Sequence, residues 1–197
     1  ILIEREKDIF FRSEDMEDLF TFSSFPVYMG CTKSCESEDL FAEQTWQISK
    51  STGVMQLKKL VPLEILYANQ HFEPIGKIWM QHHEEFSKFI NKFNSRNILE
   101  IGGGTGLLAS IAMKSKSNLN WTIIEVNPIP IEDCKAKFIN GFFNNDYKHN
   151  GKLDTIIHSH VFEHLYNPLE SVQAYSNLLD KGQRMIFSIP NMKEMLK

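Results

Sequence analysis

The sequence of 197 residues predicts an α/β fold built on a doubly wound parallel sheet. After Arg96, short apolar runs typical of buried strands alternate with segments of helical spacing, and strands separated by crossover helices form parallel sheets. The second observation is the segment NILEIGGGTGLLAS (97–110), where four glycines stand between a predicted strand and a predicted helix. Doubly wound sheets carry such turns where a strand leads into a helix at the ligand-binding edge.

A change of pattern near residue 73 divides the chain into two parts. Residues 1–72 are expected to form a small, loop-rich N-terminal lobe, because residues 21–62 combine short apolar runs with turn-like stretches such as KSTG. Residues 73–197 are expected to hold the sheet. This second part opens on a long amphipathic helix over 75–93, where apolar side chains recur at helical spacing.

Five strands and two further helices follow in the second part. The predicted strands are 97–101, 121–126, 137–141, 153–160 and 184–189. One helix covers 107–115, and the other begins with Asn167 as N-cap and Pro168 at its first position. Glu170 is placed to close a capping box in this last helix. Its predicted buried stripe consists of Leu169, Val172, Tyr175, Leu178 and Leu179.

The composition argues against several kinds of partner. The net charge of −4 gives no electrostatic basis for binding a nucleic acid. No apolar run reaches the length of a membrane helix, and no secretory signal is expected. The three cysteines, Cys31, Cys35 and Cys134, are odd in number and irregularly spaced, which favours a reducing, cytoplasmic setting over a disulfide framework.

The glycine segment has the features of a cofactor-binding turn. Glu100 precedes it, and the four glycines allow positive φ angles and a close approach of a ligand to the backbone. Glu125 ends the next predicted strand, at the position that binds ribose hydroxyls in such folds. In a dinucleotide fingerprint starting at Gly102, Leu107 would replace the third glycine, which counts against a nicotinamide cofactor. A tight turn without any ligand is the remaining alternative.

This segment resembles motif I of the class I S-adenosylmethionine-dependent methyltransferases. Two further stretches extend the resemblance, HSHVFEHLYNPLES (158–171) after the fourth predicted strand and SIPN (188–191) at the end of the fifth. The resemblance covers about residues 70–191 and implies the Rossmann-like fold of that family, with its last two strands expected to be absent. It also implies S-adenosylmethionine as cofactor and S-adenosylhomocysteine as product. The implied cofactor-binding residues are Tyr67, Glu100, Gly102, Gly103, Gly104, Gly106, Glu125, Val126, Phe143 and His158.

Earlier segments narrow the resemblance. GVMQL (53–57), PLEILY (62–67) and GKIWMQHHEEF (76–86) resemble bacterial methyltransferases that act on nucleotide sugars and capsular polysaccharide precursors. This implies methyl transfer to an oxygen of a sugar or phosphorylated small molecule in cell-surface carbohydrate biosynthesis, with the capsular O-methyl phosphoramidate as one candidate product. Tyr67 would then fold over the cofactor. Sugar C-methyltransferases of this group carry a zinc lobe with paired cysteines, but a second pair is missing here, so no metal is expected.

Three alternatives stay open beside this reading. The first is a sugar C-methyltransferase. The second is an NAD(P)-dependent oxidoreductase, which the position of Leu107 and the lack of a Tyr-x-x-x-Lys pair disfavour. The third is a cofactor-binding domain without catalysis that partners an active subunit. The expected partner is a small-molecule acceptor, with neither nucleic acid nor membrane, and the oligomeric state, a homodimer included, is left open.

Histidines gather after the fourth predicted strand, at the edge where doubly wound sheets hold their reacting groups. His160 is the predicted general base, because imidazole titrates near neutral pH. His158 is equally well explained as a core histidine, and His164 as a residue that orders the loop. An acceptor oxygen that is already anionic would need no base. Residues 82–85 (HHEE) are expected on a solvated helix face, and Trp79 in the core.

Overall fold

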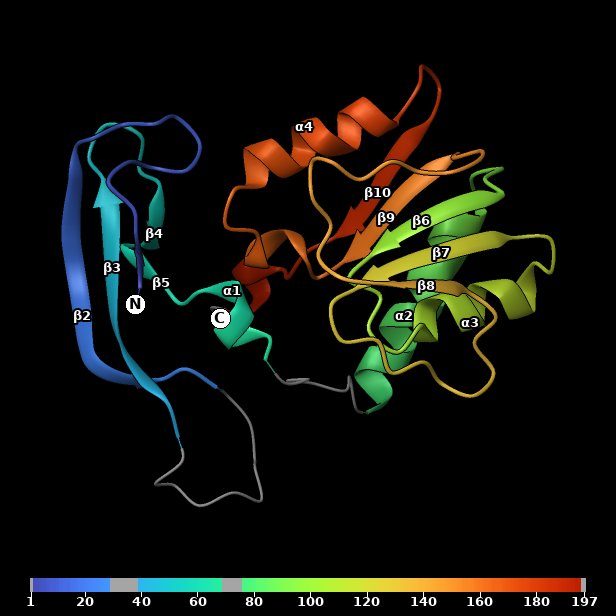
Figure 1. Cartoon of the computed structure of the whole chain (residues 1–197), viewed down its shortest axis with the longest axis horizontal. Helices are drawn as coiled ribbons and strands as arrows, with labels where there is room; N and C mark the ends of the chain where they lie inside the picture. The colour runs from blue at the N-terminus through green and yellow to red at the C-terminus, as the bar shows by residue number, and fades with distance from the viewer. Residues whose placement is uncertain (1, 29–38, 69–75, 196–197) are drawn as a thin grey trace. The chain divides into compact units, whose positions relative to one another are not determined.

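The computed structural model describes residues 2–28, 39–68 and 76–195. The chain divides into two compact units, Ile1–Phe72 and Glu73–Lys197, each with sheets of its own (Figure 1). The prediction of no zinc site in the N-terminal part concerns Cys31 and Cys35, which lie outside the described residues.

The second unit contains a five-stranded sheet in which all strands are parallel (Figure 1). Its strand order is β10-β9-β6-β7-β8, which confirms the doubly wound sheet and all five predicted strands. Strand β6 pairs with β7 on one side and with β9 on the other, so the winding direction reverses at β6. Such a reversal is where doubly wound sheets bind ligands, beyond the carboxyl ends of the strands. The strands are β6 (Asn97–Ile101), β7 (Asn120–Glu125), β8 (Lys137–Asn140), β9 (Thr155–Ser159) and β10 (Arg184–Ser188).

Helices cover both faces of this sheet (Figure 1). On one face, α2 (Lys77–Asn91) and α3 (Leu107–Ser115) pack on each other and share a core with the strands. On the other face, α4 (Pro168–Leu178) places Tyr175 in a second core with Leu99 and Ile156. Two short helices, η2 (Phe162–His164) and α5 (Met192–Met195), complete the described part of this unit. None of the helices in the described ranges combines the length and apolar character needed to cross a membrane.

Helix α4 begins where the sequence predicts, but its cap and its buried face differ. Asn167 is the N-cap residue and Pro168 follows it, yet no side-chain cap hydrogen bond forms, so the predicted capping box is wrong. Leu169 is 49% exposed and Val172 is 41% exposed, whereas Tyr175 is only 1% exposed. The helix is rotated so that Tyr175 and Pro168, seven residues apart and therefore on one face, point to the sheet. Leu169, one position after Pro168, consequently faces outward, whereas Leu178 and Leu179 pack against the second core as the sequence predicts.

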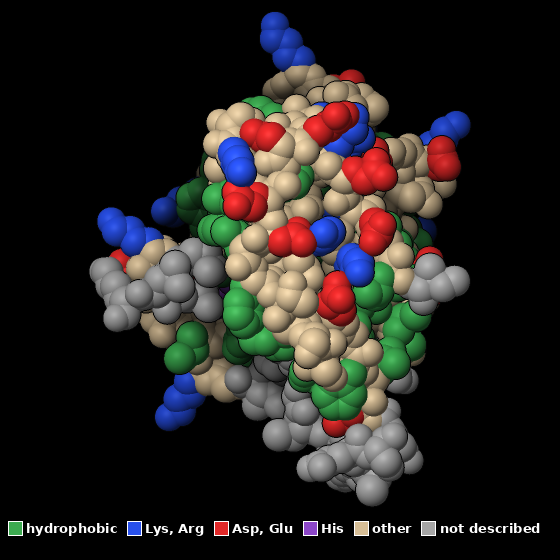
Figure 2. Space-filling view, turned by 90° about the vertical axis from the view of Figure 1, so that its left-hand side faces the viewer, with side chains coloured by type: hydrophobic (Ala, Val, Ile, Leu, Met, Phe, Trp, Pro, Cys, Tyr) green, Lys and Arg blue, Asp and Glu red, His purple; other side chains and the backbone are tan. Residues whose placement is uncertain are grey.

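The first unit is richer in strands than the sequence predicts. Strand β2 (Met16–Pro26) pairs antiparallel with β3 (Phe41–Ser49), which pairs with β4 (Met55–Leu57). Almost every side chain of β2 is exposed, so its sequence lacks the alternation that marks a half-buried strand. Figure 2 faces this unit and shows apolar side chains lying at the surface beside acidic and basic ones. The remaining elements are β1 (Ile3–Glu4) and β5 (Lys59–Leu60), which pair with each other, and α1 (Leu63–Leu66).

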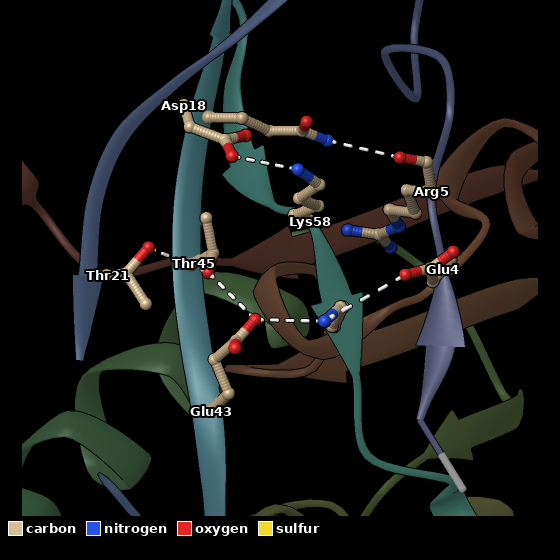
Figure 3. Close-up of polar contacts among 9 residues, drawn as sticks. Glu4, Arg5, Asp18, Thr21, Glu43, Thr45 and Lys58 are labelled. Atoms are coloured by element: carbon tan, nitrogen blue, oxygen red, sulfur yellow. Dashed lines mark hydrogen bonds and ion pairs between the residues drawn. The ribbon is translucent and has the colours of Figure 1, made fainter. Parts of the chain in front are cut away.

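Polar contacts between strands hold the first unit together (Figure 3). The hydroxyl of Thr45 lies 2.9 Å from that of Thr21 and donates to the Glu43 carboxylate at 3.2 Å. Lys59 donates to the same carboxylate at 3.0 Å, and Lys58 donates to Asp18 at 2.8 Å. These contacts link β2, β3 and β5 through side chains, because few apolar groups are available between them.

Candidate functional site

The glycine loop carries the chain from the carboxyl end of β6 into α3. Gly102, Gly104 and Gly106 have φ angles of 68°, 55° and 77°, in the left-handed region that favours glycine. Gly106 is the N-cap of α3. The amide of Gly102 donates to the carbonyl oxygen of Ile124 on β7 at 2.8 Å, which fixes the loop to the neighbouring strand. The glycines therefore set the path of the backbone at the point where the sheet reverses its winding.

The four glycines face different surroundings. A Cβ atom on Gly102 would lie 2.6 Å from Val161, one on Gly103 would lie 2.7 Å from Ile123, and one on Gly106 would lie 2.6 Å from the sulfur of Cys134. These distances are far below ordinary van der Waals contact, so three glycines are needed for packing. A Cβ atom on Gly104 would meet nothing within 4 Å. Gly104 is therefore the glycine whose open side can receive a ligand.

The carboxylate of Glu125, at the end of β7, points at this glycine. Its Oε2 accepts the amide of Gly104 at 2.9 Å, and its Oε1 accepts the amide of Asn127 at 3.1 Å. Both oxygens are thus held in place and keep further lone pairs for other donors. The sequence predicts a role for Glu125 at the cofactor, and the structure brings its carboxylate to the loop.

Glu100 lies beneath the loop instead of beside its open side. Its side chain is 3% exposed, and the indole N–H of Trp121 donates to its Oε2 at 2.7 Å. Burial and, to a smaller extent, the charge of Glu125 raise the pKa of Glu100 to about 7, although the Trp121 hydrogen bond lowers it. The carboxyl group lies so close to Gly103 that a Cβ there would be 2.8 Å from its Cδ. Glu100 therefore supports the loop from below.

Three other predicted cofactor residues are Phe143 and Val126 in the second unit and Tyr67 in the first. Phe143 packs in the second core, with its ring centroid 5.0 Å from that of Tyr175. Val126 follows β7, and its carbonyl oxygen accepts the side-chain amide of Asn140 at 3.3 Å. Tyr67 belongs to the first unit, and its role over the cofactor stays a prediction.

His158 is enclosed within the second unit. The side chain is fully buried and stacks with the rings of Phe187 at 5.2 Å and Phe162 at 6.0 Å. Among the described residues, neither of its ring nitrogens has a hydrogen-bond partner. Burial lowers the pKa of His158 to about 4, so the ring is neutral near pH 7.

His160 occupies a different environment at the end of β9. Its φ of 54° is unusual for a residue other than glycine, and its amide donates to the carbonyl oxygen of Ser188 at 3.0 Å. Its Nδ1 lies 3.3 Å from Oε1 of Glu163. The next residue, Val161, packs against Gly102, so the histidine segment and the glycine loop are in contact. The side chain of His164, in η2, is exposed, and its amide donates to the carbonyl oxygen of Val161 at 3.0 Å.

A second histidine reaches the same place from α2. Nε2 of His82 lies 2.8 Å from Oγ of Ser159, and that oxygen lies 2.9 Å from Oγ of Ser188. The rings of Trp79 and His82 each lie 5.1 Å from that of His160. The expectation of a solvated histidine pair is therefore wrong for His82.

The neighbouring histidine is even less accessible. His83 is 9% exposed, and its ring nitrogens have no partner in the described part of the chain. Burial lowers its pKa to about 4, with smaller contributions from His82 and His160. The helical spacing of Trp79, His83, Phe86 and Ile90 could have shown that this histidine belongs to the apolar stripe.

The described residues contain no group of three or more His, Cys, Asp or Glu side chains arranged to hold a metal ion. Two open cavities, of about 540 and 420 Å³, are lined by Lys148, Asn177 and Leu178. The larger one also includes Leu153 and Asp154, at the amino end of β9. We place the candidate site at the opposite, carboxyl edge, because the glycine loop, Glu125 and the histidines converge there.

Comparison with known proteins agrees with this geometry. A family model described as "Methyltransferase domain" matches residues 70–195. The chain belongs to this family of methyltransferase domains. The tRNA1(Val) (adenine(37)-N6)-methyltransferase of Flavobacteriaceae bacterium (strain 3519-10) is 36% identical over 74 residues, 32% of this chain and 32% of that protein.

Solved structures of methyltransferases are also similar to this methyltransferase domain. The plantazolicin methyltransferase BpumL, in complex with a pentazolic desmethylPZN analog and SAH, is 19% identical with a TM-score of 0.46, over 60% of this chain and 49% of that one. The mitomycin 7-O-methyltransferase MmcR is 16% identical with a TM-score of 0.46, over 57% of this chain and 36% of that one. The chain thus spans about a third of the curated relative and less than half of either solved protein.

Proposed function

We propose that this methyltransferase domain binds S-adenosylmethionine at the glycine loop and transfers its methyl group to an oxygen of a small acceptor. The observation that carries the proposal is the Glu125 carboxylate, held 2.9 Å from the amide of Gly104 beside the open side of that glycine. The site lies where β6 reverses the winding of the sheet, the position at which such sheets bind nucleotides.

The residues present fit an adenosyl cofactor. A carboxylate whose two oxygens already hold backbone amides keeps acceptor capacity for the adjacent hydroxyls of a ribose. Gly104 offers backbone without a side chain, so a ligand can lie against it. When bound, the sulfonium group of the cofactor supplies an activated methyl group. The chain must then orient the acceptor and accept its proton.

His160 is the proposed general base. The Glu163 carboxylate lies 3.3 Å from Nδ1 and can accept the proton on that nitrogen, which leaves Nε2 free to take a proton from an acceptor hydroxyl. Of the other two predicted histidines, His158 is fully enclosed and His164 is exposed. We therefore assign them to packing and to the outer rim of the site, respectively.

For the acceptor we propose a sugar or a phosphorylated precursor of a cell-surface carbohydrate, with the O-methyl phosphoramidate of capsules as one candidate. The resemblance of residues 53–57, 62–67 and 76–86 to nucleotide-sugar and capsular methyltransferases supports this class. The curated relative is named for a tRNA adenine, but the net charge of −4 does not favour a polyanionic acceptor. The cytoplasmic setting stays a prediction.

Thermal unfolding with added ligands tests the cofactor assignment. The purified chain is measured with S-adenosylmethionine, S-adenosylhomocysteine, NAD and NADP in separate samples. A ligand at 100 times its dissociation constant stabilises the folded state by about 2.7 kcal/mol, which shifts the melting temperature clearly. We expect a shift with the two sulfur compounds only, reduced in Glu125→Gln and retained in Glu132→Gln, an exposed glutamate outside the site. A shift with NAD or NADP alone would instead identify an oxidoreductase.

A further inference from the structure

We infer that His82 is a positioning residue, which acts through Ser159 and Ser188 to hold the backbone and ring of His160 in place. The inference rests on the proposed function for one point only, the use of His160 as a base. The arrangement itself stands on distances between residues of three elements, α2, β9 and β10.

His160 needs such support because its backbone is strained. With a φ of 54° it lies in the left-handed region, where a side chain crowds the following carbonyl oxygen. Strained conformations of this kind persist only when the surroundings fix them, and they concentrate at functional sites. The described structure holds the backbone here through the amide of His160, which donates to the carbonyl oxygen of Ser188 at 3.0 Å.

Ser188 is in turn part of a hydrogen-bonded chain that ends on α2. Its Oγ lies 2.9 Å from Oγ of Ser159, which lies 2.8 Å from Nε2 of His82. The two serines end adjacent strands in the register that pairs Ser188 with Ser159. Helix α2 is therefore tied to the ends of β9 and β10 at the residue that precedes His160.

The ring of His82 contacts the ring of His160 as well. Their centroids lie 5.1 Å apart at an angle of 73°, and Trp79 meets His160 in the same edge-on manner. Oε1 of Glu163 lies 3.3 Å from Nδ1 of His160. The imidazole of His160 thus contacts a carboxylate and two rings of α2, which leaves it few orientations.

The titratable groups around this pair are His83, on α2 itself, and Glu163, in η2. Burial lowers the pKa of His82, and the nearby His160 lowers it further. A neutral His82 can either donate to Ser159 or accept from it, so the hydrogen bonds from His82 through Ser159 to Ser188 persist in both tautomers.

The test is the tautomer of His160, measured by NMR on the unliganded chain labelled with ¹⁵N-histidine. His82→Phe keeps a ring of similar size against His160 but removes the hydrogen bond to Ser159. His82→Gln keeps a side chain that can reach the serine, and Gln81→Ala changes an exposed neighbour on the same helix as a matched control. Ser188→Ala removes the last hydroxyl of the hydrogen-bonded row of His82, Ser159 and Ser188 with a minimal change of volume.

We expect wild-type His160 to carry its proton mainly on Nδ1, facing Glu163. In His82→Phe and Ser188→Ala this preference should fall about fivefold, the factor that corresponds to one ordinary hydrogen bond. His82→Gln should restore most of it, and Gln81→Ala should leave it unchanged. Unaltered His160 signals in both His82→Phe and Ser188→Ala would overturn the inference.

A second measurement separates this outcome from a failure of the proposed function. Calorimetry with S-adenosylhomocysteine should give the same dissociation constant, within about twofold, for the wild type and for His82→Phe, because the hydrogen bond of His82 goes to Ser159 and not to Gly104 or Glu125. A wild type that binds no S-adenosylhomocysteine would refute the proposed function, whatever the tautomer of His160. An affinity lost only in His82→Phe would assign the residue to the cofactor site and overturn its positioning role.

Discussion

The two units of this chain are stabilised by different chemistry. Among the residues that the structure describes, the second unit buries 18 apolar side chains, whereas the first buries Leu60 alone. The first unit instead buries polar side chains, among them Asp8, Gln47 and Gln56. The Asp8 carboxylate accepts the amides of Phe10, Phe11 and Ser13. A fold can therefore be specified by hydrogen bonds in one region and by apolar packing in the next.

This difference in chemistry predicts different responses to mutation. The stability of the second unit should depend on its buried apolar volume, and that of the first on single hydrogen-bonding groups. Buried polar groups left without a partner are costly, whereas apolar cavities cost in proportion to their size.

The largest effect is expected for Leu99→Ala in the second unit. Leu99 is fully buried in the core that the parallel sheet shares with α4, and its truncation should lower the free energy of unfolding by about 3 kcal/mol. Urea denaturation followed by circular dichroism measures this. A loss below about 1 kcal/mol would show that the sheet does not depend on this core.

A smaller loss, about 2 kcal/mol, is expected for Gln56→Leu in the first unit. The Gln56 amide accepts the amide of Ile9 and donates to the carbonyl oxygen of Lys7, both at 3.0 Å. Leucine preserves the volume but leaves these two backbone groups unpaired. Hydrogen exchange should accelerate at Ile9 and along β4, while amides of β6 keep their wild-type rates. An unchanged or increased stability would mean that apolar contacts, and not hydrogen bonds, govern the first unit.

The pH dependence of the second unit should reveal its buried histidines. Burial lowers the folded-state pKa of His83 and His158 to about 4, below the 6.5 of an exposed histidine. Below pH 6.5 these histidines bind protons in the unfolded state but not in the folded state, so the free energy of unfolding is highest above pH 6.5 and falls as the pH drops from 6.5 toward 4. At pH 5.5 each of the two histidines should have lowered the free energy of unfolding by about 1 kcal/mol. The stability difference between His158→Phe and wild type should grow in favour of the variant between pH 7.5 and 5.5, and a constant difference would refute the assignment.

The smallest effect is expected for Leu169→Ser on α4. Leu169 belongs to the stripe that the sequence predicts as buried, but it is 49% exposed. The substitution should change the free energy of unfolding by less than about 0.5 kcal/mol. Tyr175→Leu, on the buried face, provides the contrast, since Tyr175 is 1% exposed. Equal losses in both variants would show that α4 is turned as the sequence predicts.

The central strands of the second unit could be predicted because they are short apolar runs enclosed on both faces, as Ile156 and Ile157 on β9 illustrate. The strands of the first unit could not, because side chains such as Phe20 and Phe22 on β2 are exposed and give no regular alternation. Their pairing depends on contacts between distant residues, for example Thr21 with Thr45.

The candidate site was predictable where it depends on the backbone. The glycine loop and Glu125 follow from their spacing along the chain, and the structure brings the two together. The contact of His82 with Ser159 was not predictable from the glutamates that follow at 84 and 85, because it depends on how α2 lies against the ends of β9 and β10. The enclosure of Glu100 beneath Gly103 likewise depends on packing against Trp121 on the neighbouring strand.

The most direct test of this account is the affinity of S-adenosylhomocysteine for the wild type and for Gly104→Ala, measured by calorimetry. Gly151→Ala is the matched control, because Gly151 also has a positive φ and open surroundings but precedes the amino end of β9. The account predicts that Gly104→Ala binds at least about tenfold more weakly while Gly151→Ala binds as the wild type does. Equal affinities for all three proteins would contradict it, because the ligand would then not lie against Gly104.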